Sequence, residues 1–388
     1  MQNPTIELQK MRLIFATNDL ELHGRKYKGF PLILNRDLEP FEPVQNFLWH
    51  IILMSGSIES TKTWETYSKG LYDYFAFLDA NEIDWKSKAG DGLPGPIEKY
   101  KEWAHGHLKL SASTVNSRIK LALRFYKWAN QAGLIDHLPF ETTTTRATNN
   151  HSFIVHTLEK PNEATTTKVL LKNTKKPLNL ITKPQLALCL EKLENETHKL
   201  MLEMICRTGL RQEELRTFPE KYIFDPSKRK DIQEGQMIFI NLDPRDMKTK
   251  GSKPRTIEIP YSLMDDLWSW SVRSRAIRAN VTTINSTTLF LTETGNPYGD
   301  SAIDSILRRL SKKTGFRITA HMGRHTYATY RLRSLINSKT FEGDPLLYVM
   351  DRLGHSSVQT TSKYLKYINM LDGTLISQHE DELDELFH

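Results

Sequence analysis

Four short segments in the C-terminal half of the chain combine residue types that can cut a phosphodiester bond. Two arginines, a lysine and two histidines from these segments could surround one phosphate. Guanidinium groups bind phosphate oxygens through paired hydrogen bonds and keep their charge. Such donors stabilise the negative charge that builds up when phosphorus becomes five-coordinate. The segments are 208–215 (TGLRQEEL), 248–253 (KTKGSK), 321–326 (HMGRHT) and 353–364 (LGHSSVQTTSKY).

Tyr364, the last residue of the fourth segment, is the candidate nucleophile. Attack by its hydroxyl oxygen on phosphorus would give a covalent phosphoester intermediate. A free tyrosine titrates at about pH 10, so the site must supply a proton acceptor or a strongly positive environment. No carboxylate cluster typical of a magnesium site accompanies these residues. This chemistry therefore requires no metal ion.

The spacing within the segments predicts the elements that position them. Arg211 and Glu214 are three residues apart, as are His321 and Arg324, so each pair shares one face of a predicted helix. The lysine-rich segment connects two predicted β-strands, at 237–242 and 256–259. Each pattern alone is weak, because a charge pair is more often a surface pair and a lysine-rich turn is more often a solvated loop. The combination in this order is what indicates a site.

In this order the four segments resemble the tyrosine recombinases of the phage-integrase family. The TGLRxxEL, HxxRH and LGHxxxxTTxxY boxes carry the resemblance, together with a lysine on a β-hairpin between the first two. The resemblance covers residues 180–370 well, extends more loosely to 46–136 and fails for 1–45. It implies a mainly α (α+β) fold, with a helical core-binding DNA domain and a mostly helical catalytic domain that holds a small antiparallel β-sheet.

The resemblance also implies a role for each matching residue. Arg211 and Arg324 would bind the scissile phosphate. His321 would hydrogen-bond the phosphate and assist proton transfer, and His355 would do the same. Glu214 would be a structural acid that steadies the first arginine segment. The matching catalytic positions are Arg211, Lys250, His321, Arg324, His355 and Tyr364.

Two of these roles concern the strands of DNA directly. Lys250 would protonate the leaving 5′ oxygen, and Tyr364 would form a 3′-phosphotyrosyl link. Lys248 and Lys253 lie on the same turn as Lys250 and stay open as alternatives. Tyr367 lies one helical turn beyond Tyr364, but only Tyr364 has the family's spacing after the histidine.

The chain departs from the family pattern at two places. Met322 and Gly323 stand where the family has Asp-Leu, which we expect to change packing more than chemistry. Residues 334–345 (SLINSKTFEGDP) are a predicted insertion between Arg324 and His355.

Composition shifts divide the chain into five parts. Residues 1–45 form an N-terminal extension without a clear role, and 46–136 are predicted to be helical. Apolar residues of 64–78 recur at helical spacing, and a second helix is predicted to start near Ser113. Residues 137–181 are a basic linker, 182–370 the catalytic domain and 371–388 an acidic tail. The candidate DNA-binding residues of the second helix are Arg118, Lys120, Arg124 and Lys127.

The bulk properties agree with a soluble DNA-binding protein. The net charge of +7 becomes +13 on residues 1–371 once the six acidic residues of the tail are set aside. No apolar run reaches membrane-spanning length, and the N-terminus lacks the pattern of a signal peptide. The two cysteines, Cys189 and Cys206, are interpreted as small buried hydrophobic residues. The expected location is the cytoplasm, in association with the nucleoid when the protein is bound to DNA.

The function implied by the resemblance is site-specific recombination for integration or excision of a mobile element, with no cofactor. The implied partners are double-stranded DNA with inverted-repeat core sites, three further copies of the chain in a tetramer, and accessory DNA-bending proteins. Apolar residues in the tail, such as Leu375 and Leu383, would let it form a helix that docks on a neighbouring subunit. Relaxation of DNA by a type IB topoisomerase-like monomer, and DNA binding without catalysis, stay open as alternatives. An RNA-binding module is disfavoured because no aromatic stacking motif is visible.

Overall fold

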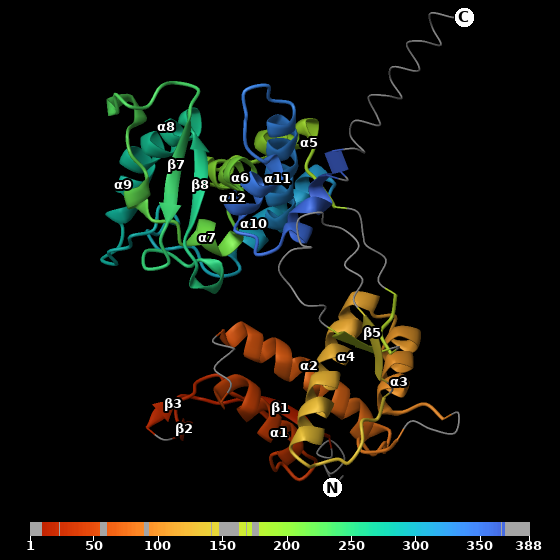
Figure 1. The fold of residues 1–388 in the computed structure, drawn as a ribbon. Coiled ribbons are helices and arrows are strands. Elements are labelled where there is room, and N and C mark those ends of the chain that lie inside the picture. Colours follow the sequence, from red (N-terminus) through yellow and green to blue (C-terminus); the bar gives the residue numbers. More distant parts are fainter. Residues whose placement is uncertain are drawn as a thin grey trace, which may run out of the picture. The chain divides into compact units, whose positions relative to one another are not determined.

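A computed structural model of the chain divides into two compact units, Met1–Lys175 and Lys176–His388, which are described separately (Figure 1). The predicted tail at 371–388 lies outside the described residues. No helix in the described part is long and apolar enough to cross a membrane. The structure describes residues 10–22, 24–54, 60–88, 93–140, 142–146, 163–167, 169–172, 178–365 and 367–368.

The N-terminal unit is built around a helical core. Its helices are α1 (Glu42–Trp49), α2 (Thr61–Ala80), α3 (Pro96–Lys101) and α4 (Ala112–Gln131), with π-helical turns at His50–Met54 and Glu102–His107. The apolar face predicted for 64–78 belongs to α2. The N-cap of α4 is Ser111 and not Ser113, because the backbone of Ser111 is extended and its hydroxyl accepts a hydrogen bond from the backbone N–H of Thr114.

The extension before residue 46 packs on this helical core. Strand β1 (Arg12–Phe15) pairs antiparallel with β4 (Pro31–Leu34), and β2 (Glu21–Leu22) pairs with β3 (Arg25–Lys26). Phe30 and Ile33 are fully buried in the same cluster as the residues of α1, α2 and α4. The predicted linker also contains regular structure, since β5 (Thr142–Arg146) pairs antiparallel with β6 (Glu163–Thr167).

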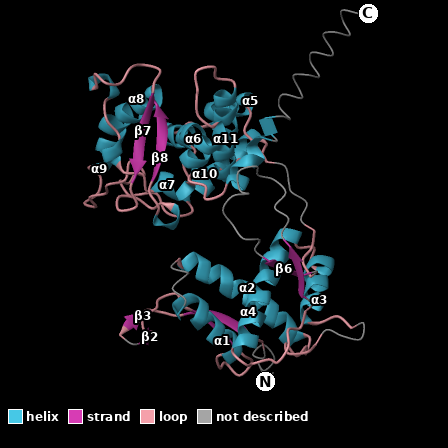
Figure 2. Ribbon diagram, in the orientation of Figure 1, coloured by secondary structure: helices cyan, strands magenta, loops and turns pink. Residues whose placement is uncertain are grey.

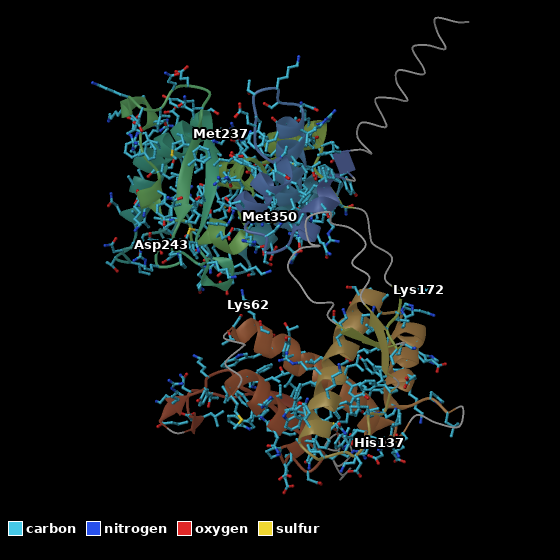
Figure 3. All side chains as sticks on the ribbon, in the orientation of Figure 1. Lys62, His137, Lys172, Met237, Asp243 and Met350 are labelled. Atoms are coloured by element: carbon cyan, nitrogen blue, oxygen red, sulfur yellow. The ribbon has the colours of Figure 1, made fainter. Side chains whose placement is uncertain are left out.

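In its described residues the C-terminal unit is mostly helical and contains a two-stranded antiparallel sheet (Figure 2). The strands are β7 (Met237–Leu242) and β8 (Arg255–Pro260), as the sequence predicts within one residue at each end. Met237 and Asp243, labelled in Figure 3, mark the start of β7 and the residue after its end. The mainly α fold with small antiparallel sheets confirms the expected fold class. The helices are α5 (Lys183–Lys192), α6 (Glu196–Thr208), α7 (Gln212–Arg216), α8 (Tyr261–Trp270), α9 (Ala276–Ala279), α10 (Ala302–Thr314), α11 (Ala320–Ile336) and α12 (Pro345–Leu353).

Two local predictions have different outcomes in this unit. The sequence Thr-Lys-Pro at 182–184 predicts the start of a helix, and Thr182 does cap α5, in a capping box with Gln185. The apolar run at 289–291 is strand-like in sequence, but it does not form a strand. Leu289, Phe290 and Leu291 are buried, but only isolated bridges lie there, between Pro219 and Thr288 and between Leu291 and Pro297.

A buried carboxylate ties the sheet to the two helices that carry the C-terminal motifs. Glu258 on β8 is fully buried and forms an ion pair with Arg331 of α11, with Nε 2.6 Å from Oε1. It also accepts hydrogen bonds of 2.8 Å from the hydroxyls of Tyr327 on α11 and Tyr348 on α12. A paired and hydrogen-bonded charge is the form in which a carboxylate is tolerated in a core. This network therefore fixes β8, α11 and α12 relative to one another.

Candidate active site

The first arginine is positioned by a sharp end to α6. Gly209 follows the helix with φ +66°, and a Cβ there would lie 2.4 Å from Cδ1 of Tyr327, so only glycine fits. Two residues later Arg211 precedes the first turn of α7. Its backbone N–H and its Nη1 each donate to the carboxylate of Glu214 at 2.8 Å. The predicted pair of Arg211 and Glu214 is thus joined by two hydrogen bonds, one from the backbone and one from the guanidinium group.

Glu214 is almost fully buried between two arginines. Arg255, the first residue of β8, places Nη2 2.5 Å from its Oε2, the oxygen that also accepts from the backbone N–H of Arg211. Burial alone would raise the pKa of this carboxyl group, but the charge and hydrogen bonds of Arg255, with those of Arg211, lower it to about 2. Glu214 is therefore ionised at neutral pH and fixes the orientation of both guanidinium groups.

The depressed pKa makes Glu214 a source of stability that acid removes. Its folded-state pKa lies below its usual value, so its contribution is complete above about pH 4.5 and is lost as the pH falls towards 2. We expect Glu214→Gln to be less stable by about 3 kcal/mol at pH 7, and the two unfolding free energies to converge as the pH falls. Urea unfolding between these pH values measures the difference. Glu191→Gln, which changes an exposed carboxylate on α5, should have an unfolding free energy within about 0.5 kcal/mol of the parent. If the difference in unfolding free energy between Glu214→Gln and the parent does not shrink as the pH falls, Glu214 is not the ionised carboxylate described here.

The second arginine meets the first at the end of α12. Arg324 on α11 is buried and donates to the backbone oxygens of Gly209 and Leu353. Arg211 Nη2 donates to the same Leu353 oxygen and to that of Gly354, both at 3.0 Å. Helices α6 and α11, which bring these groups together, pack side by side (Figure 1). Two guanidinium groups thus share one carbonyl oxygen.

The guanidinium groups of Arg211 and Arg324 repel each other at this short range, and a bound anion would reduce that repulsion. Burial, together with the charges of Arg211 and Arg255, lowers the pKa of Arg324 to about 9. The group still carries its charge at neutral pH. Like charges held close together in advance of a ligand are typical of a site for an anion.

His321 and His325 extend the site along α11. His321 is exposed, and its ring centroid lies 4.1 Å from that of the buried His325. Desolvation and the charges of Lys363 and Arg324 lower the pKa of His321. Both rings therefore lie within reach of the arginine pair.

The last segment brings in the second histidine and the tyrosine. Gly354 ends α12 with a left-handed backbone, and His355 Nδ1 then lies 2.9 Å from Oγ1 of Thr361. The His355 ring stacks on the Tyr364 ring at 12°. Burial, followed by the charge of Arg324, lowers the pKa of His355 to about 3, so its ring is neutral.

Tyr364 lies in the helical stretch 358–365 and is 1% exposed. Its hydroxyl lies 2.8 Å from Nδ1 of His325. Burial raises the pKa of the phenol to about 12, although the charge of Arg324 opposes the effect. Tyr364 is thus a protonated phenol beside two histidines and an arginine.

The three lysines of the hairpin turn differ in their surroundings. Lys248 Nζ lies 3.4 Å from the carboxylate of Glu213. Lys250 is exposed in a short 3₁₀ turn (Lys250–Ser252), and its charge is among those that lower the pKa of His321. Lys253 is exposed. The charge of Lys250 therefore reaches the histidine side of the site.

The structure gathers all six expected catalytic positions and Glu214 into the C-terminal unit, and it adds three residues that sequence reasoning did not assign. Arg255 and His325 contact site residues directly, and Lys363 places Nζ 5.1 Å from the centroid of the Tyr364 ring. His325 and Lys363 stand next to assigned residues in the sequence, so their adjacency was the available signal.

The four basic residues predicted to bind DNA lie on α4 of the N-terminal unit and do not behave alike. Arg118 is half-buried and forms an ion pair with Asp73 at 2.7 Å. Lys120, Arg124 and Lys127 are exposed, and their spacing places them on one side of the helix. The charge of Arg118 is thus already balanced inside its own unit.

Comparison with known proteins gives a consistent assignment. The family described as "Phage integrase family" matches residues 179–368. Transposase A from transposon Tn554 of Staphylococcus aureus is 22% identical over 386 residues, which cover 95% of this chain and 98% of that protein. Tyrosine recombinase XerD of Staphylococcus saprophyticus is 28% identical over 193 residues, 48% of this chain and 54% of that protein.

Solved structures match the fold. The XerH site-specific recombinase bound to palindromic difH substrate gives a TM-score of 0.54 at 18% identity, with 83% of this chain and 81% of that chain covered. The Tn1549 transposon integrase in complex with a circular intermediate DNA gives a TM-score of 0.52 at 17% identity, covering 81% and 92%. Residues 179–368 thus form a phage integrase family domain, and the chain is a tyrosine-type site-specific recombinase.

Proposed function

We propose that this recombinase cuts and rejoins double-stranded DNA through a covalent bond between Tyr364 and a 3′ phosphate, in the integration or excision of a mobile element. One observation carries the proposal. The guanidinium groups of Arg211 and Arg324 meet at the backbone oxygen of Leu353, in the same cluster as the buried Tyr364. Two fixed positive groups beside a tyrosine hydroxyl suit attack on a phosphodiester.

The proposed chemistry assigns each group a task. Arg211 and Arg324 hold the scissile phosphate, and their charge stabilises the five-coordinate transition state. His321 and His355 donate further hydrogen bonds to its oxygens. The Tyr364 oxygen bonds to phosphorus while the bond to the 5′ oxygen breaks. Because Tyr364 is buried beside His325, the side chains that cover it must move aside before a phosphate can reach its oxygen.

The larger assembly is also part of the proposal. The exposed Lys120, Arg124 and Lys127 on α4 suit contacts with the phosphates of a duplex, whereas the ion-paired Arg118 suits them less. We infer a core-binding role for residues 46–136, a basic linker at 137–181 and a catalytic role for 182–370. Inverted-repeat core sites and a tetramer on synapsed DNA complete the proposal. Similarity over nearly the full length to a transposon's transposase favours a mobile element as the substrate.

The test is the capture of a covalent adduct. Nicked suicide duplexes tiled across the DNA on both sides of the gene would be incubated with the protein and run on a denaturing gel. Cleavage near the nick releases a short strand and prevents rejoining, so a shifted band with one duplex is the expected result. An absence of any adduct across the tiles would count against the function. Relaxation of supercoiled plasmids without such a sequence would favour the topoisomerase-like alternative.

The hairpin lysine gives a sharper prediction. We expect Lys250→Ala to slow cleavage by about 100-fold or more, because the leaving 5′ oxygen loses its proton donor. A substrate with sulfur in place of that bridging oxygen should restore the rate, since a thiolate leaves without a proton. The single-turnover rate of adduct formation measures both effects. Lys248→Ala and Lys253→Ala serve as matched controls and should change the rate less than tenfold; the lysine whose loss is rescued by sulfur is the proton donor.

A further inference from the structure

The Tyr364 hydroxyl has one hydrogen-bond partner in the described part of the chain, Nδ1 of His325 at 2.8 Å. The other histidines of the site are placed differently. His355 stacks on the tyrosine ring but directs Nδ1 to Thr361. His321 is exposed, and its ring contacts the ring of His325. His325 is therefore the group placed to receive the phenolic proton.

The position of His325 is fixed by its surroundings. It follows Arg324 on α11 and is 6% exposed. Its ring packs against His321 at 4.1 Å and against the Tyr364 ring at 5.5 Å between centroids. A side chain held on a long helix and packed on both sides keeps its geometry without reorganisation, which favours proton transfer.

We propose that His325 is a catalytic residue that accepts the proton of Tyr364 during cleavage and returns it during rejoining. This inference rests on the proposed function and deepens it. In cleavage the proton passes from the tyrosine oxygen to Nδ1 as the oxygen–phosphorus bond forms. The bond to the 5′ oxygen breaks, and that oxygen takes a proton from Lys250. In rejoining the oxygen of the 5′ hydroxyl attacks phosphorus and gives its proton back to Lys250, while the tyrosine oxygen leaves and takes its proton back from His325.

The charges around His325 couple this transfer to DNA binding. Desolvation, followed by His321, Lys363, Arg324 and His355, lowers the pKa of His325 to about 3 in the DNA-free site. A base this weak leaves the proton on the phenol. A phosphodiester bound among the same positive groups brings negative charge to them and raises the proton affinity of His325. The tyrosine is thus activated when its substrate is in place.

The experiment separates proton transfer from hydrogen bonding. Asparagine places its amide close to the position of Nδ1, so His325→Asn can keep a hydrogen bond to the phenol but cannot take its proton. With a duplex that the unmodified protein cleaves, we expect His325→Asn to slow adduct formation by about 100-fold or more. The same loss should appear in rejoining from a preformed adduct. The bridging-sulfur substrate should rescue Lys250→Ala but not His325→Asn.

A more acidic nucleophile provides the rescue that a purely structural role would not give. Replacement of Tyr364 by 3,5-difluorotyrosine lowers the pKa of the phenol, so His325→Asn should lose much less activity in that background. His198→Asn is the matched control, because His198 also contacts a tyrosine hydroxyl in this unit, that of Tyr298 at 3.4 Å. This control should cleave at the parent rate.

The possible outcomes distinguish a failure of the role proposed for His325 from a failure of the proposed function. A His325→Asn rate within threefold of the parent, or rescue by the bridging sulfur, overturns the role of His325 while the proposed function stands. A slow rate that difluorotyrosine does not improve also overturns it, since the defect is then structural. If the unmodified protein forms no adduct with any duplex, the proposed function itself has failed.

Discussion

Tyr364→Phe should form no covalent adduct with any DNA while still binding the duplex that the parent protein cleaves. The phenylalanine keeps the ring that is 1% exposed and stacked on His355 but removes the oxygen that attacks phosphorus. Binding should persist because phosphate contacts come from arginines and lysines that the change leaves intact. The adduct is measured on a denaturing gel and binding on a native gel.

Tyr367→Phe is the matched control for this prediction. Tyr367 lies three residues further on and is half-buried, whereas the hydroxyl at hydrogen-bond distance from His325 is that of Tyr364. The Tyr367 variant should form adduct at close to the parent rate. An adduct from Tyr364→Phe, or its loss in Tyr367→Phe alone, would assign the nucleophile to the other tyrosine.

Local chemistry made several elements predictable from the sequence. Thr182 caps α5 because a side-chain oxygen and an N–H three residues later are all that the cap requires. Strands β7 and β8 follow from apolar alternation around a polar turn. The cap at Ser111 was missed because two serines stand near the start of α4, and only the backbone angles choose between them.

The contacts that complete the site were not predictable in this way. Arg255 meets Glu214 across 41 residues of sequence, and His325 meets Tyr364 across 39. No periodicity links such pairs, because their approach depends on how β8, α11 and α12 pack. The short apolar run at 289–291 shows the same limit, since a buried stretch of three residues has no period that distinguishes a strand from a buried loop.

Backbone carbonyl oxygens, which carry no net charge, hold the arginine side chains of the site in place. Arg211 and Arg255 pair with one carboxylate, that of Glu214, and Arg324 adds a third positive charge nearby, so the cluster has an excess of positive charge. The oxygens of Gly209, Leu353 and Gly354 accept hydrogen bonds from Arg211 and Arg324 without cancelling that excess. The guanidinium groups are thus fixed in place and still attract an anion, which is the arrangement that electrostatic preorganisation requires.

Arg324→Lys should lower the single-turnover rate of cleavage by about 1,000-fold, with a much smaller change in DNA affinity. Lysine keeps the charge, but a single ammonium cannot donate to the Gly209 and Leu353 oxygens and to a phosphate in the same fixed geometry. Loss of one preorganised donor costs about 3–4 kcal/mol of transition-state stabilisation. The rate of adduct formation and the dissociation constant, measured on the same duplex, separate the two effects.

Arg333→Lys is the control for this change, because Arg333 lies on the same helix beside Thr182 and Asn337, on the wall of a separate pocket. That variant should cleave at the parent rate. Thermal unfolding of both variants guards against a global defect, since Arg324 is buried and its loss removes the hydrogen bond to the Gly209 oxygen, whereas the Leu353 oxygen keeps Arg211 as a donor. A folded Arg324→Lys protein that cleaves within tenfold of the parent would show that charge alone suffices. The shared contact at Leu353 would then serve packing, and the transition state would depend on Arg211 and the histidines.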